Sequence, residues 1–489
     1  MTRFWPPVLG MGVAVVVAAI VVLTPAPQSI EWWLVIAGGI AASVPLLIGL
    51  MSRFDIFEPV YLFAFSYFVL FVAHPAFELS QPGGVPDFLG YSPTPTYAAA
   101  LAFALLGAVG FYIGYYSAAG TKLAHRIPLP PTNWSRATFN AFITGLTVTS
   151  LTLFGLFLAS TGGLSTLKAV VAGRNAISVA ALHASSGYLY SAPLWITPIG
   201  VLLIARAPKL RSSMGLIGFL LLCVSQVTAV ALGDRSWLVP AAASVILVIY
   251  LRKGQRPSLQ TVAIGLLLVF AFGITLPRQY RNGLDGITFT DAIASSISDP
   301  GRQVGEFLGG ADTGMVDDLA IELQFVPASL NYQFGNTYLE ALVRPVPRAL
   351  WSGKPIEADS QLMRAIWPRF QAAGIGFAFS FFGEPFLNFG WFGVFILALI
   401  FGMLSRTLYA WFRREAWNPA VIAVYALSWP FVFVYMRGGF GGDYQRQLIY
   451  VLPVIGALVF AGIKRRRPTD SRFHNMAPSS WTHRAQLDR

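Results

Sequence analysis

The sequence predicts an all-α protein that crosses a membrane many times, and three observations lead to this fold class. Of its 489 residues, 55% are hydrophobic and only 11% are charged, whereas soluble domains carry about 25% charged residues. The mean hydropathy is +0.61, which excludes both a soluble globular protein and a disordered chain. The apolar residues are gathered in long runs between polar segments, which is typical of membrane-spanning helices.

Twelve apolar stretches approach or exceed the length of about 17 residues that a helix needs to cross a hydrocarbon core of about 30 Å. In chain order these predicted spans are Val8–Leu23, Ile30–Leu50, Val60–Ala73, Tyr97–Ser117, Phe139–Ala159, Leu189–Ala205, Met214–Leu232, Leu238–Leu251, Val262–Leu276, Phe386–Leu404, Ala420–Met436 and Gln447–Ile463. Arg3 before the first stretch also fits a signal peptide, but no clear small-x-small cleavage site follows and a second span comes at once. We therefore expect the first stretch to be a retained helix.

The Lys and Arg residues between the spans predict the orientation, because cytoplasmic segments of membrane proteins are enriched in these residues. The formal charge is +12, from 34 Lys and Arg against 22 Asp and Glu. With the N-terminus inside, the inside segments hold 21 of the cations and 5 of the acids, which leaves 13 cations and 17 acids outside. Each inside segment after the first hairpin carries a cluster of cations, so both termini are predicted to be cytoplasmic.

The spans divide the chain into four parts. These are 1–276 with nine spans and an outside loop at 160–188, 277–385 as a large outside loop, 386–463 with three spans, and 464–489 as a disordered cytoplasmic tail. In the first outside loop, the apolar spacing of 164–174 predicts a short amphipathic helix at the membrane surface. In the large loop we expect short helices packed on the membrane face rather than a separate sheet domain. The large loop exceeds ordinary connections in length, so it should carry function.

Several classes of function are excluded by what the sequence lacks. It has no G-x-x-x-x-G-K-[ST] phosphate-binding loop, and no inside segment is long enough for an ATPase or a nucleotide-sugar domain. Metal patterns such as H-E-x-x-H and the G-x-S-x-G signature of serine hydrolases are also absent. The single cysteine, Cys223, lies in an apolar run, so neither a disulfide nor a cysteine metal site is expected. Orientation accounts for the positive charge, so we expect no nucleic-acid partner.

The cations of the outer side are the most informative charged residues, because the orientation rule works against them. Clustered guanidinium groups at a membrane interface suit phosphate or diphosphate, which they bind through two hydrogen bonds without losing their charge. The candidates are Arg174 in the amphipathic stretch, Arg235 in a tight turn, Arg278 and Arg281 at i, i+3 spacing, Arg344, Arg348 and Lys354 in the large loop, and Arg437 and Arg446 around the glycine run 438–442. The alternative is that they form ordinary ion pairs with Asp234, Asp443 and other acids. The glycine run either permits close backbone approach or is a flexible turn.

Chemistry on a diphosphate-linked substrate would also need a general base. Glu384 is the best-placed carboxylate, because it lies at the mouth of the tenth span, and Asp443 is second. The alternative for Glu384 is a capping or pairing role at the start of the helix. His74 and His183 are the histidines of the outer segments and are weaker candidates. The adjacent acids Asp317 and Asp318 would point apart on a helix or a strand, so metal binding there is not expected.

Two stretches of the sequence resemble a known family. The first, at 335–355, reads GNTYLEALVRPVPRALWSGKP, and the second, at 383–390, reads GEPFLNFG. They are similar to the G-x-T-Y-L…I-P-R-x-L-W-x-x-K-P and G-E-x-Y-L-N-F-G stretches of Wzy-type O-antigen polymerases, which join oligosaccharide repeat units. The turn before Arg235 and the stretch from Gly162 to Arg174 fit the family more weakly. This chain departs at Pro385 and Phe386, where the family more often has a tyrosine in the second position.

The resemblance implies a GT-C-like membrane glycosyltransferase of the bacterial cytoplasmic membrane. Such polymerases extend chains on polyprenyl-diphosphate-linked repeat units at the outer face, without a metal ion and without a cofactor, and arginines hold the diphosphate. By motif position, the resemblance carries roles over to Arg235, Arg348, Lys354 and Glu384, whereas the other candidates come from the residues alone. The implied partners are the lipid-linked oligosaccharide, membrane lipid and a regulator of chain length.

Two other functions remain open at this stage. A glycan ligase would share the fold and the donor but use a different acceptor, and it would more often rely on an outer histidine such as His183. A transporter or flippase for the lipid-linked oligosaccharide would place ionisable residues deep within the spans and would show internal repeats. The spans here hold almost no ionisable residues, and the sequence has no evident repeat. Both features disfavour transport.

Overall fold

The computed structural model describes residues 29–51, 54–132, 134–160, 189, 191–231, 237–258, 260–262, 300–344, 346, 350–372 and 379–462. Within these residues the structure is built from helices and contains no β-strand. A helical fold is what lipid requires, because a helix satisfies the hydrogen bonds of its backbone within its own segment. The predicted all-helical fold class is therefore confirmed for the described part of the chain.

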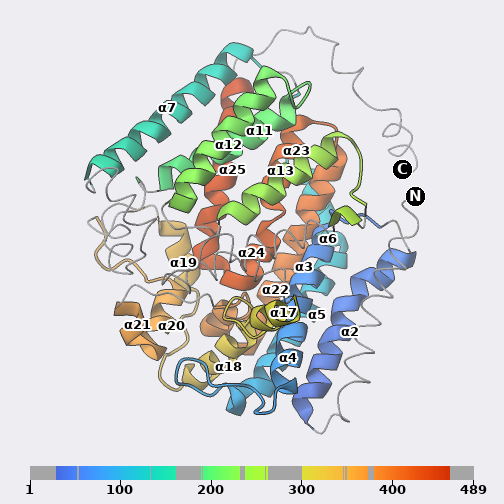
Figure 1. Ribbon diagram of the computed structural model, residues 1–489, viewed down its shortest axis with the longest axis vertical. Helices are drawn as coiled ribbons and strands as arrows, with labels where there is room; N and C mark the ends of the chain where they lie inside the picture. The colour runs from blue at the N-terminus through green and yellow to red at the C-terminus, as the bar shows by residue number, and fades with distance from the viewer. Residues whose placement is uncertain are drawn as a thin grey trace.

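The described helices are named as in Figure 1. They are α2 (Ile30–Met51), α3 (Pro59–Phe68), the π-helix η1 (Val69–Ala73), α4 (His74–Ser80), the 3₁₀-helix η2 (Thr94–Thr96), α5 (Tyr97–Tyr116), α6 (Ala118–Arg126), α7 (Arg136–Ser160), the 3₁₀-helix η3 (Ala192–Ile196), α11 (Thr197–Arg206), α12 (Ser213–Ala231), α13 (Leu238–Arg252), α17 (Pro300–Leu308), α18 (Met315–Phe325), α19 (Asn336–Val343), α20 (Ala358–Ile366), α21 (Pro368–Ala372), α22 (Gly383–Arg414), α23 (Pro419–Ser428), α24 (Phe431–Gly438) and α25 (Phe440–Gly462).

Seven helical segments of the described chain are long and apolar enough to cross a membrane. They are Ile30–Gly49, Pro59–Ser80, Thr94–Tyr116, Arg136–Ser160, Gly383–Arg414, Pro419–Gly438 and Asp443–Gly462. Three shorter apolar helices, Ala192–Arg206, Ser213–Ala229 and Leu238–Arg252, occupy the positions of the sixth, seventh and eighth predicted spans. The first predicted span and nearly all of the ninth lie outside the described residues, as do the predicted helix at 164–174 and the tail at 464–489. The chain is thus a polytopic membrane protein.

Local sequence signals explain where several of these helices begin and bend. Pro59 opens α3 and Pro419 opens α23, the first-turn position in which the missing N–H of proline costs nothing. The side chain of Asn418 also caps α23 by accepting a hydrogen bond from the N–H of Ala420 at 3.0 Å. Within α22, Gly390 adopts φ 62° and ψ −155°, which interrupts the helix one turn inside the predicted outer surface.

The α22 helix packs along α5 through glycines. A Cβ atom on Gly114 would overlap the carbonyl oxygen of Leu399, and one on Gly402 would overlap that of Phe111. Gly110 and Gly114 form the G-x-x-x-G spacing that lets the backbones of membrane helices approach closely. This contact holds α22 against the N-terminal helices and so fixes the position of its first residues, where Glu384 lies.

In the ion pairs found between described residues, the two partners are predicted to lie on the same side of the membrane. Asp55 accepts hydrogen bonds from two nitrogens of Arg256 at 2.6 Å each, and Glu58 accepts one from Arg406 at 2.8 Å. All four of these residues belong to predicted inside segments. Predicted outside residues likewise pair with one another, as Arg437 does with Asp312 at 2.7 Å. This separation supports the predicted alternation of the spans.

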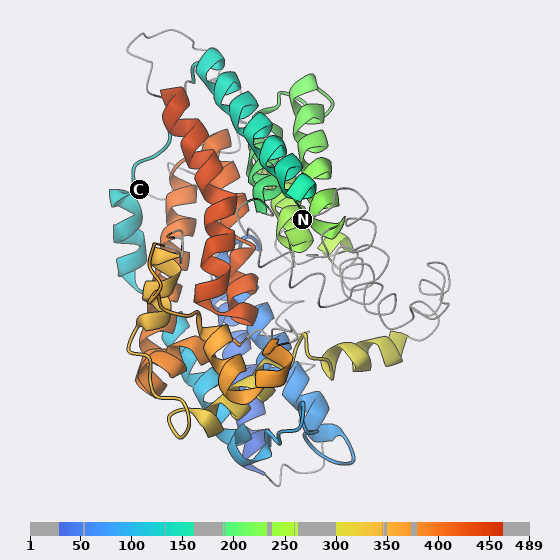
Figure 2. The ribbon, with the colours of Figure 1, turned by 90° about the vertical axis from the view of Figure 1, so that its left-hand side faces the viewer.

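The described parts of the large loop form the short helices α17 to α21. Of these helices, α18, α20 and α21 lie with α4 toward one end of the long axis, α7, α11 and α12 lie toward the other end, and α19 lies between the two groups (Figure 1). The view turned by 90° shows the same separation (Figure 2). The α18 helix packs on α5 and α20, and α19 packs on α22 and α25. The loop helices therefore pack on the helices that carry the candidate site, beside the ends that are predicted to face outward.

Candidate functional site

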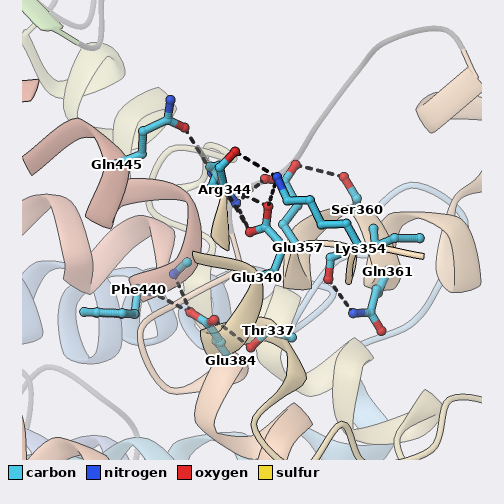
Figure 3. A network of polar contacts seen from close by, with 12 residues as sticks. Thr337, Glu340, Arg344, Lys354, Glu357, Ser360, Gln361, Glu384, Phe440 and Gln445 are labelled. Carbon is cyan, nitrogen blue, oxygen red and sulfur yellow. Dashed lines mark hydrogen bonds and ion pairs between the residues drawn. The ribbon is translucent and has the colours of Figure 1, made fainter. Parts of the chain in front are cut away.

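The second residue of α22, Glu384, is a buried carboxylate with a complete set of partners. Its Oε1 accepts a hydrogen bond from the hydroxyl of Thr337 at 2.8 Å. Its Oε2 accepts hydrogen bonds from the N–H groups of Phe440 at 2.7 Å and Gly441 at 2.8 Å (Figure 3). These amides open α25, so Glu384 caps that helix, where the unpaired N–H groups and the helix dipole favour a negative charge.

The glycine run 438–442 makes this close approach possible. Gly439 adopts φ 76°, a left-handed conformation that glycine reaches without the cost of a side chain. A Cβ atom on Gly441 would lie only 3.0 Å from Oε1 of Glu384. Of the two roles considered for the run, close backbone approach is the one found in the structure.

Thr337 and Asn388 join the two sequence motifs into one polar unit. The side-chain oxygen of Asn388 accepts a hydrogen bond from the N–H of Gly335 at 2.8 Å. Its amide nitrogen donates to the hydroxyl of Thr337 at 2.7 Å and to the backbone carbonyl of Glu384 at 2.8 Å. The Thr337 hydroxyl thus accepts from Asn388 while it donates to Glu384. All three side chains are buried, so each hydrogen bond replaces a contact with water.

Arg344 lies just after α19 and binds two carboxylates. Its Nε donates to both oxygens of Glu340 at 3.1 Å, and its Nη2 donates to Glu340 at 2.5 Å and to Glu357 at 2.7 Å (Figure 3). Its Nη1 lies 3.4 Å from the side-chain oxygen of Gln445 on α25. Burial alone would lower the pKa of Arg344, but the bond to Glu340 and the charge of Glu357 together raise it above its ordinary value. The guanidinium group is therefore charged and held in one orientation.

Lys354 folds its loop back onto the end of α19. Its Nζ donates hydrogen bonds to the carbonyl oxygens of Arg344 at 2.8 Å and Val346 at 3.3 Å. The same nitrogen lies 3.9 Å from Oε1 of Glu340. The cluster of Glu340, Arg344, Lys354 and Glu357 therefore combines two cations with two carboxylates, of which Glu340 and Lys354 are buried, and we call it the α19 charge cluster.

Arg437 and Arg446 lie on the two sides of the break between α24 and α25, and their side chains are more exposed than those of the two cations of the α19 charge cluster. The exposed fractions are 37% for Arg437 and 38% for Arg446, against 15% for Arg344. Arg446 lies 3.3 Å from the buried carboxylate of Asp443 and also stands over the ring of Trp237. These two guanidinium groups are therefore better placed to meet an anionic ligand than Arg344 is.

The α18 helix buries three carboxyl groups for which the described residues supply no Arg or Lys in ion-pair contact. Asp317, Asp318 and Glu322 are buried, and neither oxygen of Glu322 has a hydrogen-bond partner. Burial, together with the nearby Asp318 and Glu384, raises the pKa of Glu322 well above its ordinary value. Burial and the nearby Asp317 do the same to the pKa of Asp318. Glu322 and Asp318 therefore keep their protons to a higher pH than ordinary carboxyl groups do.

His74 is the partner of the third acid. Its Nε2 lies 3.0 Å from Oδ2 of Asp317, and its Nδ1 contacts the carbonyl oxygen of Leu308. Because a carbonyl only accepts hydrogen bonds, Nδ1 carries a proton, and a further proton lies between Nε2 and the carboxylate. This contact ties α4 to α18. Within the described residues, no group of three or more His, Cys, Asp and Glu is arranged to hold a metal ion.

The structure brings some of the predicted site residues together and leaves others undescribed. Glu384, Arg344, Lys354 and Asp443 lie around the contact between α19, α22 and α25, with Arg437 and Arg446 beside them. Five predicted residues lie outside the described residues, namely Arg174, Arg235, Arg278, Arg281 and Arg348.

Sequence reasoning missed several members of the site. Glu340 had a local signal, because it lies four residues before Arg344 and this spacing places opposite charges side by side on a helix. Thr337 and Asn388 lie inside the two motifs but are not ionisable, so a search for charged groups passed over them. No local pattern identified Glu322, because the sequence of a short helix does not show whether an acid on it is buried.

Comparison with known proteins gives one match. The family model described as O-antigen polysaccharide polymerase Wzy matches residues 11–466. No curated protein and no solved structure is found to match this chain. The matched region includes every described helix.

Proposed function

We propose a function that starts from one established point: this chain belongs to the O-antigen polysaccharide polymerase Wzy family. The family assignment makes it a membrane polymerase of oligosaccharide repeat units. We propose that the units are linked to a polyprenyl diphosphate and that they are joined on the outer face of the bacterial cytoplasmic membrane, with both termini of the chain inside.

One observation carries the proposal for the site: the two family motifs meet at the outer end of α22, where Glu384, Thr337 and Asn388 form a buried unit beside the α19 charge cluster. Fixed polar groups at a membrane boundary can stabilise charge that develops during a reaction, because they need no reorganisation. The unit joins α19, α22 and the start of α25, which carries Asp443 and Arg446. The carboxylates and cations that a diphosphate substrate needs are thus within one region.

In the proposed reaction, a hydroxyl of the acceptor unit attacks the anomeric carbon of the donor sugar. A new glycosidic bond forms as the bond between that carbon and the diphosphate oxygen breaks, and the diphosphate leaves with the electron pair. Arg437 and Arg446, with Arg344 and Lys354 behind them, compensate the charge of the leaving group. The undescribed cations Arg174, Arg235, Arg278, Arg281 and Arg348 are proposed to complete this binding surface.

The proton of the acceptor hydroxyl passes to Glu384 or Asp443. Glu384 is fixed by three hydrogen bonds, so it receives a proton only as one of them lengthens. Asp443 faces the partly exposed Arg446, whose movement toward the diphosphate would leave this carboxylate more basic. We propose that the reaction uses neither a metal ion nor a cofactor and that a separate protein regulates chain length.

Reconstituted protein tests this function. Liposomes containing the protein and a labelled polyprenyl-diphosphate-linked repeat unit should yield a ladder of glycans that differ by one repeat unit. Translocation of the label without extension would identify a flippase instead. Transfer of single units only to an added lipid-linked core oligosaccharide would identify a ligase.

A further inference from the structure

Glu322 of α18 is a buried acid whose capacity for hydrogen bonds is left unused by the described residues. The residue is 0% exposed, and neither oxygen of its carboxyl group has a hydrogen-bond partner in the described part of the chain. A buried polar atom without a partner costs free energy, so its presence in a folded protein calls for an explanation in terms of function or of a bound molecule. The packing of α18 alone does not provide that explanation.

The carboxyl group of Glu322 lies against the first residue of α22. A Cβ atom on Gly383 would overlap Oε2 of Glu322, so a glycine at this position leaves room for the carboxyl group. Gly383 is followed directly by Glu384. The charge of Glu384 also contributes, after burial and Asp318, to the raised pKa of Glu322. Glu322 and Glu384 therefore form a pair of acids at the outer end of α22.

The two acids of this pair have opposite surroundings. Glu384 accepts hydrogen bonds from the hydroxyl of Thr337 and from two N–H groups of α25, and such donors stabilise a carboxylate and make it a weak base. Glu322 has no such donors among the described residues. Glu384 is also only 2% exposed, so water outside the protein does not reach it directly. A proton taken up by Glu384 is thus weakly held, and a second acid lies beside it.

Tyr338 of α19 supplies a third polar group to this region. Its hydroxyl is buried and has no hydrogen-bond partner within the described structure. Burial, followed by the charges of Glu384 and Glu322, raises the pKa of Tyr338 well above its ordinary value. The phenol therefore keeps its proton and is available as a hydrogen-bond donor beside the two acids.

Further ionisable groups lead from Glu322 toward the outer surface. Asp318 lies four residues before Glu322, which places the two acids on one face of α18, and its Oδ1 also lacks a partner among the described residues. Burial and Asp317 raise the pKa of Asp318, and the charge of Arg437 opposes them. Arg437 in turn pairs with Asp312 at 2.7 Å, and these two side chains are 37% and 31% exposed. The series of acids therefore begins beside Glu384 and ends at groups that meet water.

We propose that Glu322 is the proton-relay residue of the candidate site, which takes the proton of the acceptor hydroxyl from Glu384 and passes a proton on to Asp318. The proposal rests on the proposed function and on Glu384 as its base. A protonated carboxyl group has both an acceptor oxygen and an O–H donor, so Glu322 binds the incoming proton at one oxygen and releases its own from the other. Asp318 passes a proton in the same way to Asp312 and so to water. Each relay restores the carboxylate of Glu384 for the next repeat unit.

Comparison of the first turnover with repeated extension tests this relay. Glu322→Gln keeps the shape of the side chain, but its amide does not accept and release a proton. With protein in excess over the lipid-linked repeat unit, formation of the first glycosidic bond should proceed at the normal rate, because Glu384 still takes up one proton. With the repeat unit in excess, extension should slow by about tenfold or more, because Glu384 is not restored. Glu322→Asp retains a carboxyl group and should recover part of this rate.

The control makes the same chemical change on an exposed acid of a neighbouring loop helix. The side chain of Glu306 on α17 is 44% exposed, and Glu306→Gln should leave both phases unchanged. Equal slowing of the two phases by Glu322→Gln would assign Glu322 a purely structural role, and unchanged repeated extension would show that the proton leaves by another path. Either result overturns the proposal, as does an equal effect of Glu306→Gln. Wild-type protein that extends no unit would instead contradict the proposed function, so the two failures are distinguishable.

Discussion

The α18 and α19 helices both bury acidic side chains beside Glu384, but only α19 supplies them with cations. On α18, Asp318 and Glu322 lie four residues apart and neither forms an ion pair in the described structure. On α19, Glu340 occupies the same i, i+4 relation to Arg344 and binds it directly. A buried carboxyl group without a cation takes up a proton, whereas one with a bidentate guanidinium partner stays charged. We therefore predict that α18 forms a neutral wall of the site and that α19 forms a charged one.

Removing the cation from the charged wall should give the largest effect. Arg344→Ala leaves the buried Glu340 and its neighbour Glu357 without their main partner, which should lower the free energy of unfolding by about 3–5 kcal/mol. Thermal unfolding in detergent and the yield of folded protein measure this loss. Arg344→Lys restores the charge but not the two-pronged geometry, so it should recover only part of the stability. A fully stable Arg344→Ala protein would show that the α19 charge cluster is not a structural unit.

Neutralising one acid on each helix compares the two walls directly. Glu340→Gln should lower the free energy of unfolding by about 1–3 kcal/mol, because it leaves Arg344 with fewer charged acceptors. Glu322→Gln should be neutral or stabilising, because burial raises the pKa of Glu322 and disfavours its charged form. Chemical denaturation of both variants at pH 7 makes the comparison. Equal destabilisation by the two substitutions would mean that Glu322 is ionised.

A smaller effect is expected for the hydroxyl that joins α19 to Glu384. Thr337→Val keeps the shape of the side chain but removes a donor to Glu384 and an acceptor from Asn388. The buried amide then lacks a partner, so stability should fall by about 1–2 kcal/mol and chain extension should slow. Thr337→Ser retains the hydroxyl and is the control. If Thr337→Val protein extends chains normally and folds in normal amounts, Thr337 does not belong to the active site.

The neutral wall also predicts a dependence of stability on pH. Because the pKa of Glu322 is raised from 4.5 by folding, the folded chain holds more protons than the unfolded chain above that pH. The contribution of Glu322 to stability is complete at low pH and is lost as the pH rises toward the raised pKa. Unfolding free energies measured at increasing pH should therefore fall less steeply for Glu322→Gln than for the wild type. Parallel pH profiles would contradict the neutral state of this residue.

The smallest effect on stability is expected for an ion pair with the same i, i+4 spacing whose side chains are exposed at the surface. Arg302 and Glu306 of α17 form an exposed ion pair, with a nitrogen–oxygen distance of 2.9 Å. Water and salt screen such a pair, so Arg302→Ala should change stability by about 0.5 kcal/mol or less and leave the polymer ladder unchanged. A large loss from this substitution would mean that spacing, rather than burial, decides the value of these pairs.

The positions of the helices were better predicted from the sequence than the surroundings of each helix face. Long apolar runs locate the described spans because lipid requires continuous helices, and the ion pairs found between described residues join residues that are predicted to lie on the same side. The α19 helix buries Thr337 and Glu340 and exposes Leu339 and Leu342. This arrangement could not be predicted in the same way. The spacing of Leu339 and Leu342 identifies one face of a helix, but it does not tell whether protein or lipid covers that face.

The candidate site was predictable in its residue types and less so in its contacts. Arg344 and Lys354 were identified because the orientation rule works against cations on the predicted outer side, and Glu384 and Asp443 because they lie at the mouths of predicted spans. The cap that Glu384 forms on α25 joins residues 56 and 57 positions apart, and local sequence patterns do not encode such a contact. The burial of the α18 acids was missed for the same reason, since it depends on α5 and α20.

The most direct test of the account measures chain extension by variants that neutralise each candidate base. Glu384→Gln and Asp443→Asn proteins are reconstituted at equal folded amounts with the lipid-linked donor, and their glycan ladders are compared with those of the wild type and Arg302→Ala. The account predicts that at least one of the two neutral variants binds the donor but forms no ladder. Normal ladders from both variants would contradict the proposal that the outer ends of α22 and α25 form the active site.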